Sequence, residues 1–168
     1  MDISVQYLRP VQVLSARCGG AYASSAPTAW QTIRSWLEAQ CLDRRTHVKQ
    51  AVGCVYGALS CAATVAAPAV RAYDACIELH PAAVHVPKIG LTLQTLDGGT
   101  FAVYRLQGPH AQISRTLALM QTDWLPASGF VADPARPVLE IFQNDPAEVP
   151  KAELLTNICL PVRLGRVA

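Results

Sequence analysis

The chain has 168 residues, of which 51% are hydrophobic and 15% are charged, so it is long enough for one buried core and too apolar for a disordered segment. Its net charge of +2 comes from scattered basic residues, apart from the adjacent pair Arg44-Arg45, which argues against a basic stripe for nucleic acid. Residues 1–20 contain no continuous apolar stretch of signal-peptide or membrane-span length. We therefore expect one cytoplasmic domain over residues 1–168, outside the membrane.

The chain begins with a predicted strand and a predicted helix. Residues 11–17 follow the apolar alternation of a strand, and an earlier strand segment from Ile3 is separated from them by Pro10, which lacks a ladder donor. Ser24-Ser25 are candidate N-caps for a helix, and Pro27 suits its first turn. One apolar stripe of this helix comprises Trp30, Ile33, Leu37 and Cys41.

Four strands follow the first helix. Residues 51–59 and 69–79 predict two strands joined by an alanine-rich loop. Residues 90–96 and 101–107 predict two more, and the turn residues Asp97-Gly98-Gly99 between them favour a hairpin.

The last part of the chain predicts a second helix and two final strands. The helix spans residues 110–124, and its apolar stripe comprises Ile113, Leu117, Met120 and Trp124. The strands lie near residues 138–142 and 154–162, and proline-containing turns bracket the first of them.

Three motifs of the first half recur in the same order in the second half. Arg17-x-x-Gly20 returns as Arg105-x-x-Gly108, and Val52-x-Cys54-x-Tyr56 resembles Val138-x-Glu140-x-Phe142. The third pair is Tyr73-Asp74-Ala75-Cys76-Ile77 and Thr156-Asn157-Ile158-Cys159-Leu160. This pattern predicts two strand-helix-strand-strand repeats, over about residues 2–80 and 88–164, related by a pseudo-twofold axis. The fold class is α+β, with an antiparallel sheet and both helices on one side of it.

The cysteines and histidines do not form a recognisable metal site. The six cysteines include no C-x-x-C pair, and Cys54, Cys76 and Cys159 occupy apolar strand positions that favour buried thiols. The four histidines share no spacing with one another or with an acid. We expect neither a bound metal nor a cofactor.

Several segments together resemble the GyrI-like small-molecule-binding family, which is also the effector-binding domain of many AraC-type and MerR-type regulators. They are Arg17-Cys18-Gly19-Gly20-Ala21-Tyr22, Tyr73-Asp74-Ala75-Cys76-Ile77, Gly98-Gly99-Thr100-Phe101-Ala102-Val103, Gln107-Gly108-Pro109, Trp124-Leu125-Pro126-x-Ser128-Gly129, Pro137-x-x-Glu140-Ile141-Phe142 and Thr156-Asn157-Ile158-Cys159-Leu160-Pro161-Val162.

The resemblance implies a ligand groove between two helices and the sheet. It also implies small organic ligands, often cationic or planar. Regulators of this family carry a helix-turn-helix before this domain, whereas the first predicted strand here begins within about ten residues of Met1. We therefore expect no direct DNA binding. Residues 56–68 also depart from an Asp-x-Pro turn that relatives often carry, so the loop beside the groove is expected to differ in shape.

Glu140 is the first candidate site residue. It lies between Val138 and Phe142 on one face of an apolar strand, where burial disfavours the charged form and raises the pKa of a carboxyl. The resemblance also places a ligand-contacting acid on this strand. Glu140 is therefore a candidate cation receptor or general acid. The alternative is a structural glutamate that faces water on an edge strand or pairs with Arg105 or Arg136.

Aromatic residues are the other candidates for the ligand site. A flat or cationic ligand is bound well by aromatic walls through stacking and cation–π contact. The tyrosines carry a hydroxyl that needs a partner when buried, while the tryptophans also fit apolar helical stripes and hence an ordinary core. The candidates are Tyr22, Tyr56, Tyr104, Trp30, Trp124 and Phe142.

Three functions remain open from the sequence. The first is a binding protein that senses or sequesters a small organic molecule. The second, implied by the resemblance, is a hydrolase of cyclopropane-bearing genotoxic natural products that uses Glu140 with Tyr22 or Tyr56. The third is an interaction module that acts on gyrase or on a separate regulator, which requires an exposed apolar patch instead of a deep pocket.

Overall fold

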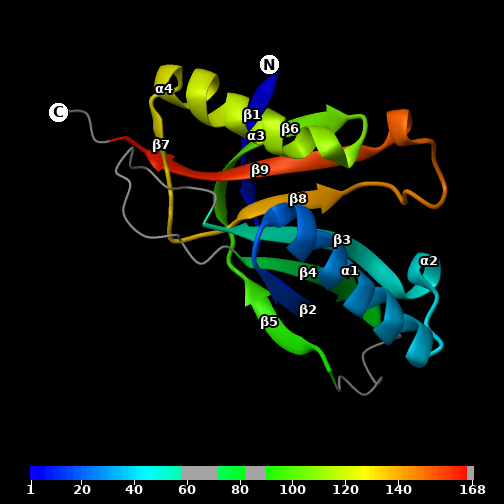
Figure 1. Cartoon of the computed structure of the whole chain (residues 1–168). Helices are drawn as coiled ribbons and strands as arrows, with labels where there is room; N and C mark the ends of the chain where they lie inside the picture. The colour runs from blue at the N-terminus through cyan, green and yellow to red at the C-terminus, as the bar shows by residue number, and fades with distance from the viewer. Residues whose placement is uncertain (58–71, 82–89, 166–168) are drawn as a thin grey trace.

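The computed structural model describes residues 1–57, 72–81 and 90–165, and its core is one curved antiparallel sheet (Figure 1). The first half contains β1 (Ile3–Leu8), β2 (Val11–Gly19), the helix α1 (Tyr22–Ala39), the short helix α2 (Arg44–His47), β3 (Val48–Tyr56) and β4 (Ala72–Leu79).

The second half repeats this order with a more irregular helix. It contains β5 (Thr92–Leu96), β6 (Gly99–Gln107), the 3-10 turn η2 (His110–Gln112), α3 (Ile113–Leu119), the π-helical turn η3 (Met120–Trp124), α4 (Leu125–Ala127), β7 (Phe130–Ala132), β8 (Val138–Phe142), η4 (Lys151–Glu153) and β9 (Leu155–Leu164). No helix among the described residues is long and apolar enough to span a membrane.

The strands run in the order β1-β6-β9-β8-β3-β4-β2-β5, and β7 pairs with the end of β9. All strand pairs are antiparallel, which confirms the predicted α+β class. The blocks β6-β9-β8 and β3-β4-β2 meet at the β8–β3 pair, so each predicted repeat supplies one block. The superposition of the two repeats about a pseudo-twofold axis stays a prediction.

The predicted hairpin between residues 90–96 and 101–107 is wrong. β5 pairs with β2 and is the last strand at one end of the sheet, whereas β6 pairs with β1, the last strand at the other end. The residues Asp97-Gly98-Gly99 do not join two paired strands; they connect β5 to β6 where this connection passes the one between β1 and β2. A Cβ atom at Gly98 would lie 2.6 Å from the carbonyl oxygen of Leu8, so a glycine is needed where the two strand connections pass each other.

The start of the first helix also differs from the prediction. The helix begins at Tyr22, its N-cap is Ala21, and no side chain caps it. The Ser24 hydroxyl donates to the Ala21 carbonyl at 3.0 Å, so it is a first-turn residue and not the N-cap. Pro27 therefore lies inside the helix. Cys41 is exposed beyond the helix end and has a positive φ of 53°, so it does not belong to the apolar stripe.

The remaining predicted elements are close to those observed. The strands predicted at 51–59 and 69–79 correspond to β3 and β4, although residues 58–71, which include the predicted loop, lie outside the described residues. The second helix follows the predicted span, interrupted by the π turn, and the final strands are β8 and β9. The short strand β7 was not predicted.

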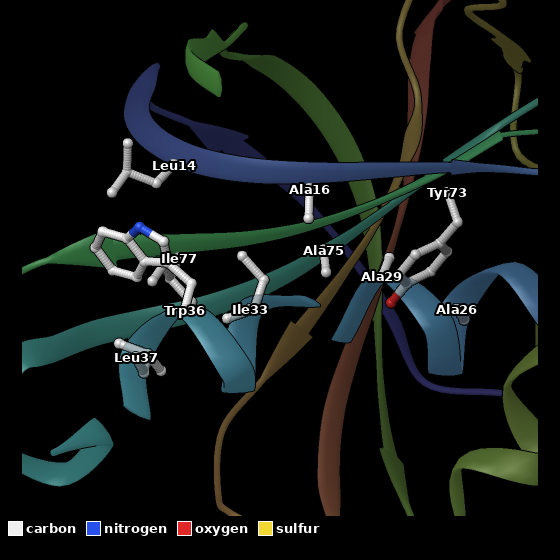
Figure 2. Close-up of a cluster of buried hydrophobic side chains, with 10 residues drawn as sticks. All are labelled: Leu14, Ala16, Ala26, Ala29, Ile33, Trp36, Leu37, Tyr73, Ala75 and Ile77. Carbon is white, nitrogen blue, oxygen red and sulfur yellow. The ribbon is translucent and has the colours of Figure 1, made fainter. Parts of the chain in front are cut away.

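The core has a cluster under each helix and a third on the opposite face of the sheet. Under α1, Ile33, Trp36 and Leu37 pack against Leu14 and Ile77 of the sheet (Figure 2). Under α3 and η3, a second cluster is centred on the helix residues Ile113 and Met120. The opposite face holds Cys54, Cys76 and Cys159, which are fully buried as predicted. Both helices cover the same side of the sheet, with β8 and β3 between them (Figure 1).

Candidate functional site

A groove opens between the two helices, above β8 and β3. The helix α1 packs on β2 and β4, and α3 packs on β9, so the central strands are left uncovered by helix. The resulting cavity has a volume of about 520 Å³. Its walls are mainly apolar and aromatic, but Arg34 and Arg44 also line it. The other lining residues include Tyr22, Trp30, Tyr73, His110, Glu140 and Phe142. This size and lining are typical of sites for small organic molecules.

Glu140 lies at the base of this groove and is only 1% exposed. One carboxylate oxygen, Oε1, accepts a hydrogen bond from the Tyr22 hydroxyl at 2.8 Å. The other, Oε2, accepts from the Tyr73 hydroxyl at 2.9 Å. The indole nitrogen of Trp30 donates in turn to the Tyr73 oxygen at 3.0 Å. Glu140 therefore receives two direct hydrogen bonds from side chains of α1 and β4.

Gly53 makes room for this arrangement. It is the register partner of Glu140 on the neighbouring strand β3. A Cβ atom at this position would overlap the Tyr73 hydroxyl and would lie 2.8 Å from Oε2 of Glu140. A glycine in the middle of a strand is typical where another group approaches the backbone closely. The hydrogen bond between Tyr73 and Glu140 therefore depends on the missing side chain.

Burial raises the pKa of Glu140 to about 7, because the charged form loses its hydration. The hydrogen bonds from Tyr22 and Tyr73 act in the opposite direction and favour the charged form. The pKa values of both tyrosines are raised, mainly by burial and also by the nearby carboxylate, so their hydroxyls remain protonated donors. Near neutral pH the carboxyl thus titrates between a neutral acid and a buried anion.

The two arrangements expected for a structural Glu140, an edge strand facing water or a pair with Arg105 or Arg136, are not observed. The strand β8 lies between β3 and β9, so Glu140 is not on an edge. Arg136 forms an ion pair with Asp133 at 2.9 Å, and Arg105 donates to the side-chain oxygen of Asn157 at 3.3 Å. Within the described residues, no ion pair involves Glu140. Its negative charge therefore lacks a positive partner in this part of the chain.

Of the predicted aromatic contacts, Tyr22, Trp30 and Phe142 line the groove, and their contact with a ligand stays a prediction. The rings of Trp30 and Phe142 meet edge to face, with centroids 5.5 Å apart. Tyr22 and Tyr73 form a similar edge-to-face pair at 5.7 Å. Together these rings provide both ring faces and ring edges around the carboxylate.

The other aromatic candidates do not line this cavity. Tyr104 and Trp124 pack against the core cluster under α3, and the Trp124 ring stacks on Phe130 at a centroid distance of 6.2 Å. Strand β9 separates β6 from β8, which keeps Tyr104 away from Glu140. Tyr56 borders a second, smaller cavity, and its ring lies under the Arg17 guanidinium at 4.7 Å.

Sequence reasoning missed Tyr73 and His110 as groove residues. Tyr73 shares an apolar strand face with Ala75 and Ile77, so it resembles ordinary core. The available signal was Gly53, an isolated glycine within an apolar strand. His110 borders the groove beside Phe142, with ring centroids 5.0 Å apart. Burial, and to a lesser extent the charge of Arg44, lowers the pKa of His110, which favours the neutral imidazole.

The model of the GyrI-like small-molecule-binding domain matches residues 1–163 of the chain. A comparison with curated proteins found no match. Among solved structures, the C-terminal domain of EcmrR has a TM-score of 0.70 and 12% identity, with 98% of each chain covered. This chain spans 58% of the EcmrR chain in a structure of an EcmrR-DNA complex.

Two further solved structures share the fold. SAV2435 bound to tetraphenylphosphonium has a TM-score of 0.64 and 12% identity, and the match covers 97% of this chain and 94% of that one. A hydrolase from Listeria innocua has a TM-score of 0.57 and 13% identity, with 96% and 91% covered. At these identities the likeness concerns the fold alone.

Proposed function

Because the chain belongs to the GyrI-like small-molecule-binding family, we propose that it binds flat organic cations in the groove, with the positive charge beside Glu140. We propose further that binding serves to sense or to sequester such molecules. EcmrR has been solved in a complex with DNA, but this proposal for the present chain concerns the ligand only.

The observation that carries this proposal is the buried carboxylate without a cationic partner in the described residues. An isolated buried charge is costly, and a ligand cation would supply the missing counter-charge in a site with little water. The rings of Trp30 and Phe142 add cation–π and stacking contacts beside it. The tetraphenylphosphonium bound by SAV2435 is an aromatic cation with a tetrahedral centre, which supports the positive charge and the aromatic rings of the proposed ligand but not its flatness.

A matched pair of ligands tests the proposal. N-methylacridinium is a flat cation, and acridine is its neutral counterpart at about pH 8, where Glu140, with a pKa of about 7, is mostly ionised. Glu140→Gln keeps the shape of the side chain and removes its charge. Calorimetry should show a loss of about 1–3 kcal/mol for N-methylacridinium, as for a charge-assisted contact, and little change for acridine.

The exposed Glu153 provides the matched control, since it lies on η4 and does not line the groove. Glu153→Gln should leave both affinities unchanged. If Glu140→Gln weakened both ligands equally or neither of them, Glu140 would have a structural role and the proposal would fail.

A second candidate is the hydrolase, which the contact between Tyr22 and Glu140 favours. A carboxyl with a pKa of about 7 is well placed for proton transfer near neutral pH, and the protonated Tyr22 hydroxyl in the same groove is a hydrogen-bond donor that can orient a reacting group. One neighbour in fold is named a hydrolase. Mass spectrometry of a spiro-cyclopropyl dienone incubated with the protein tests this. Ring-opened, hydrated product that disappears in Glu140→Gln indicates catalysis, whereas unchanged probe indicates binding alone.

A further inference from the structure

A second cavity adjoins the groove on the far side of the Glu140 site. It has a volume of about 260 Å³, and we call it the far compartment. Tyr22, Tyr73 and Glu140 line both cavities, so the two meet at this cluster. The far compartment extends from there past the first turn of α1, at Ser25, and along α3 to Gln121 of η3.

Ser25 gives the far compartment an unused polar group. The residue is 1% exposed, and its hydroxyl has no hydrogen-bond partner among the described residues. A helical serine usually donates to the carbonyl four residues earlier, which here is Ala21. That carbonyl already accepts from the Ser24 amide, the Ser24 hydroxyl and the Ser25 amide, at 3.0, 3.0 and 2.9 Å. The usual acceptor is therefore occupied, and the Ser25 hydroxyl is left without a partner among the described residues, buried beside the far compartment that Ser25 lines.

The lining also restricts the charge of an occupant. Among the described residues around the far compartment, Glu140 alone carries a formal charge. An anionic group in the far compartment would be repelled by this carboxylate. A cationic group there, in addition to one beside Glu140 in the groove, would lose its hydration without gaining a counter-charge. A neutral group that accepts one hydrogen bond avoids both costs and satisfies the Ser25 hydroxyl.

We propose that the far compartment binds the neutral polar end of an elongated ligand, and that Ser25 donates a hydrogen bond to a carbonyl or ether oxygen of that end. This inference rests on the proposed function, because it places the cationic ring system of the same ligand in the groove beside Glu140. The ligand class is then an aromatic cation with an oxygen-bearing arm, and Ser25 determines the specificity for the arm.

Three acridinium probes test the inference on the whole protein. They carry an N-methyl group, an N-pentyl chain, or a chain of pentyl length with a ketone near its end. We expect both long probes to bind more tightly than the methyl probe, because the arm adds apolar contact. Ser25→Ala should weaken the ketone probe by about three- to tenfold, the usual effect of one neutral hydrogen bond, and should not weaken the pentyl probe.

Two variants serve as controls. Ser24→Ala changes a neighbouring serine that is exposed and lines neither cavity, so no affinity should change. Ala118→Leu narrows the far compartment from α3, where Ala118 is exposed and tolerant of a larger side chain. It should remove the advantage of both long probes and leave the methyl probe unaffected.

The stability of the free protein gives an independent measure of Ser25. Ser25→Ala removes a buried hydroxyl that has no hydrogen-bond partner among the described residues, so the Tm should be unchanged or higher. Ser24→Ala loses the bond to Ala21 and should lower it.

The outcomes separate the two proposals. If the methyl probe does not bind to the wild type, the proposed function itself fails. If the methyl probe binds but the long probes have no advantage, or Ser25→Ala leaves the ratio of ketone to pentyl affinity unchanged, the far compartment does not hold the arm as described. A lower Tm for Ser25→Ala would show a structural hydrogen bond at Ser25 and would also overturn the inference.

Discussion

Gly53→Ala should disrupt the centre of the site, although the same change normally stabilises a strand. Alanine in a strand is ordinarily favoured over glycine by about 0.5–1 kcal/mol, because glycine loses more backbone freedom on folding. Here the added methyl group would overlap the Tyr73 hydroxyl oxygen and would lie 2.7 Å from the ring carbon Cζ and 2.8 Å from Oε2 of Glu140. Tyr73 is 1% exposed and lines both cavities, so its hydroxyl could give way only by moving away from Oε2 of Glu140, which breaks their hydrogen bond.

The expected loss follows from these contacts. Overpacking of a buried site costs about 1–3 kcal/mol, and the lost hydrogen bond to a charged group costs about 1.5–3 kcal/mol. After the intrinsic gain from alanine is subtracted, the free energy of unfolding should fall by about 2–5 kcal/mol at pH 8. The pKa of Glu140 should also rise above about 7, since the Tyr73 hydrogen bond favours the charged form.

Urea unfolding and carboxyl NMR titration measure these two effects. The matched control is Gly19→Ala, because Gly19 lies at the exposed end of β2 with no atom near the added Cβ. The control should change stability by no more than about 0.5 kcal/mol, as exposed substitutions usually do. Equal stability of the two variants, together with an unchanged pKa of Glu140, would show that the close approach at Gly53 does not support the site.

Three other predictions concern titration and thiol reactivity. Folding raises the pKa of Glu140 from 4.5 to about 7, so the protonated form of this residue favours the folded state. The free energy of unfolding of the wild type should therefore fall by about 3 kcal/mol as the pH rises from 4.5 to 7. Urea unfolding should show this decrease in the wild type and its absence in Glu140→Gln. Arg17→Met should lower the free energy of unfolding by about 2 kcal/mol at pH 7, measured by calorimetry, because it leaves the buried Asp74 without its ion-pair partner. Since Arg17 is largely exposed, the loss is moderate. The difference should vanish at a pH below the lowered pKa of Asp74, where this carboxyl is neutral. Cys159 should react with Ellman's reagent only after unfolding, because burial raises the pKa of its thiol to about 12. The exposed Cys41 should react in the native protein. Labelling of Cys159 in the native protein, detected by peptide mass spectrometry, would contradict this.

Local sequence patterns were sufficient to predict most helices and strands of this fold, but not which strands pair with each other. As expected, β8 places Val138 and Phe142 on one face of the sheet and Leu139 and Ile141 on the other. The helical stripe of Ile33 and Leu37 also appears in the structure. The residues Asp97-Gly98-Gly99 are a strong turn signal, yet the strands on either side pair with β2 and β1. Strand partners depend on contacts between distant segments, and a turn signal does not report them.

The same distinction applies to the site. Glu140 was predictable because a charge in an apolar strand is a local anomaly. Tyr73 was not, because its ring fits the apolar face of β4, and only the fold brings its hydroxyl to Glu140. Tyr104 and Trp124 were expected near a ligand on equally good aromatic grounds, but the strand order and the stacking on Phe130 place them in the core under α3.

The exchange of β1 and β5 between the two halves affects how the protein folds. The first strand of each half pairs with the other half, as Ile3 does with Tyr104 and Val11 with Leu96. Neither half can complete its own sheet edge without residues that are far away in the sequence. Such non-local pairing gives a high contact order, which slows folding and makes the structure form as one cooperative unit. A weakened contact in one half will therefore loosen the ligand groove from both of its sides at once.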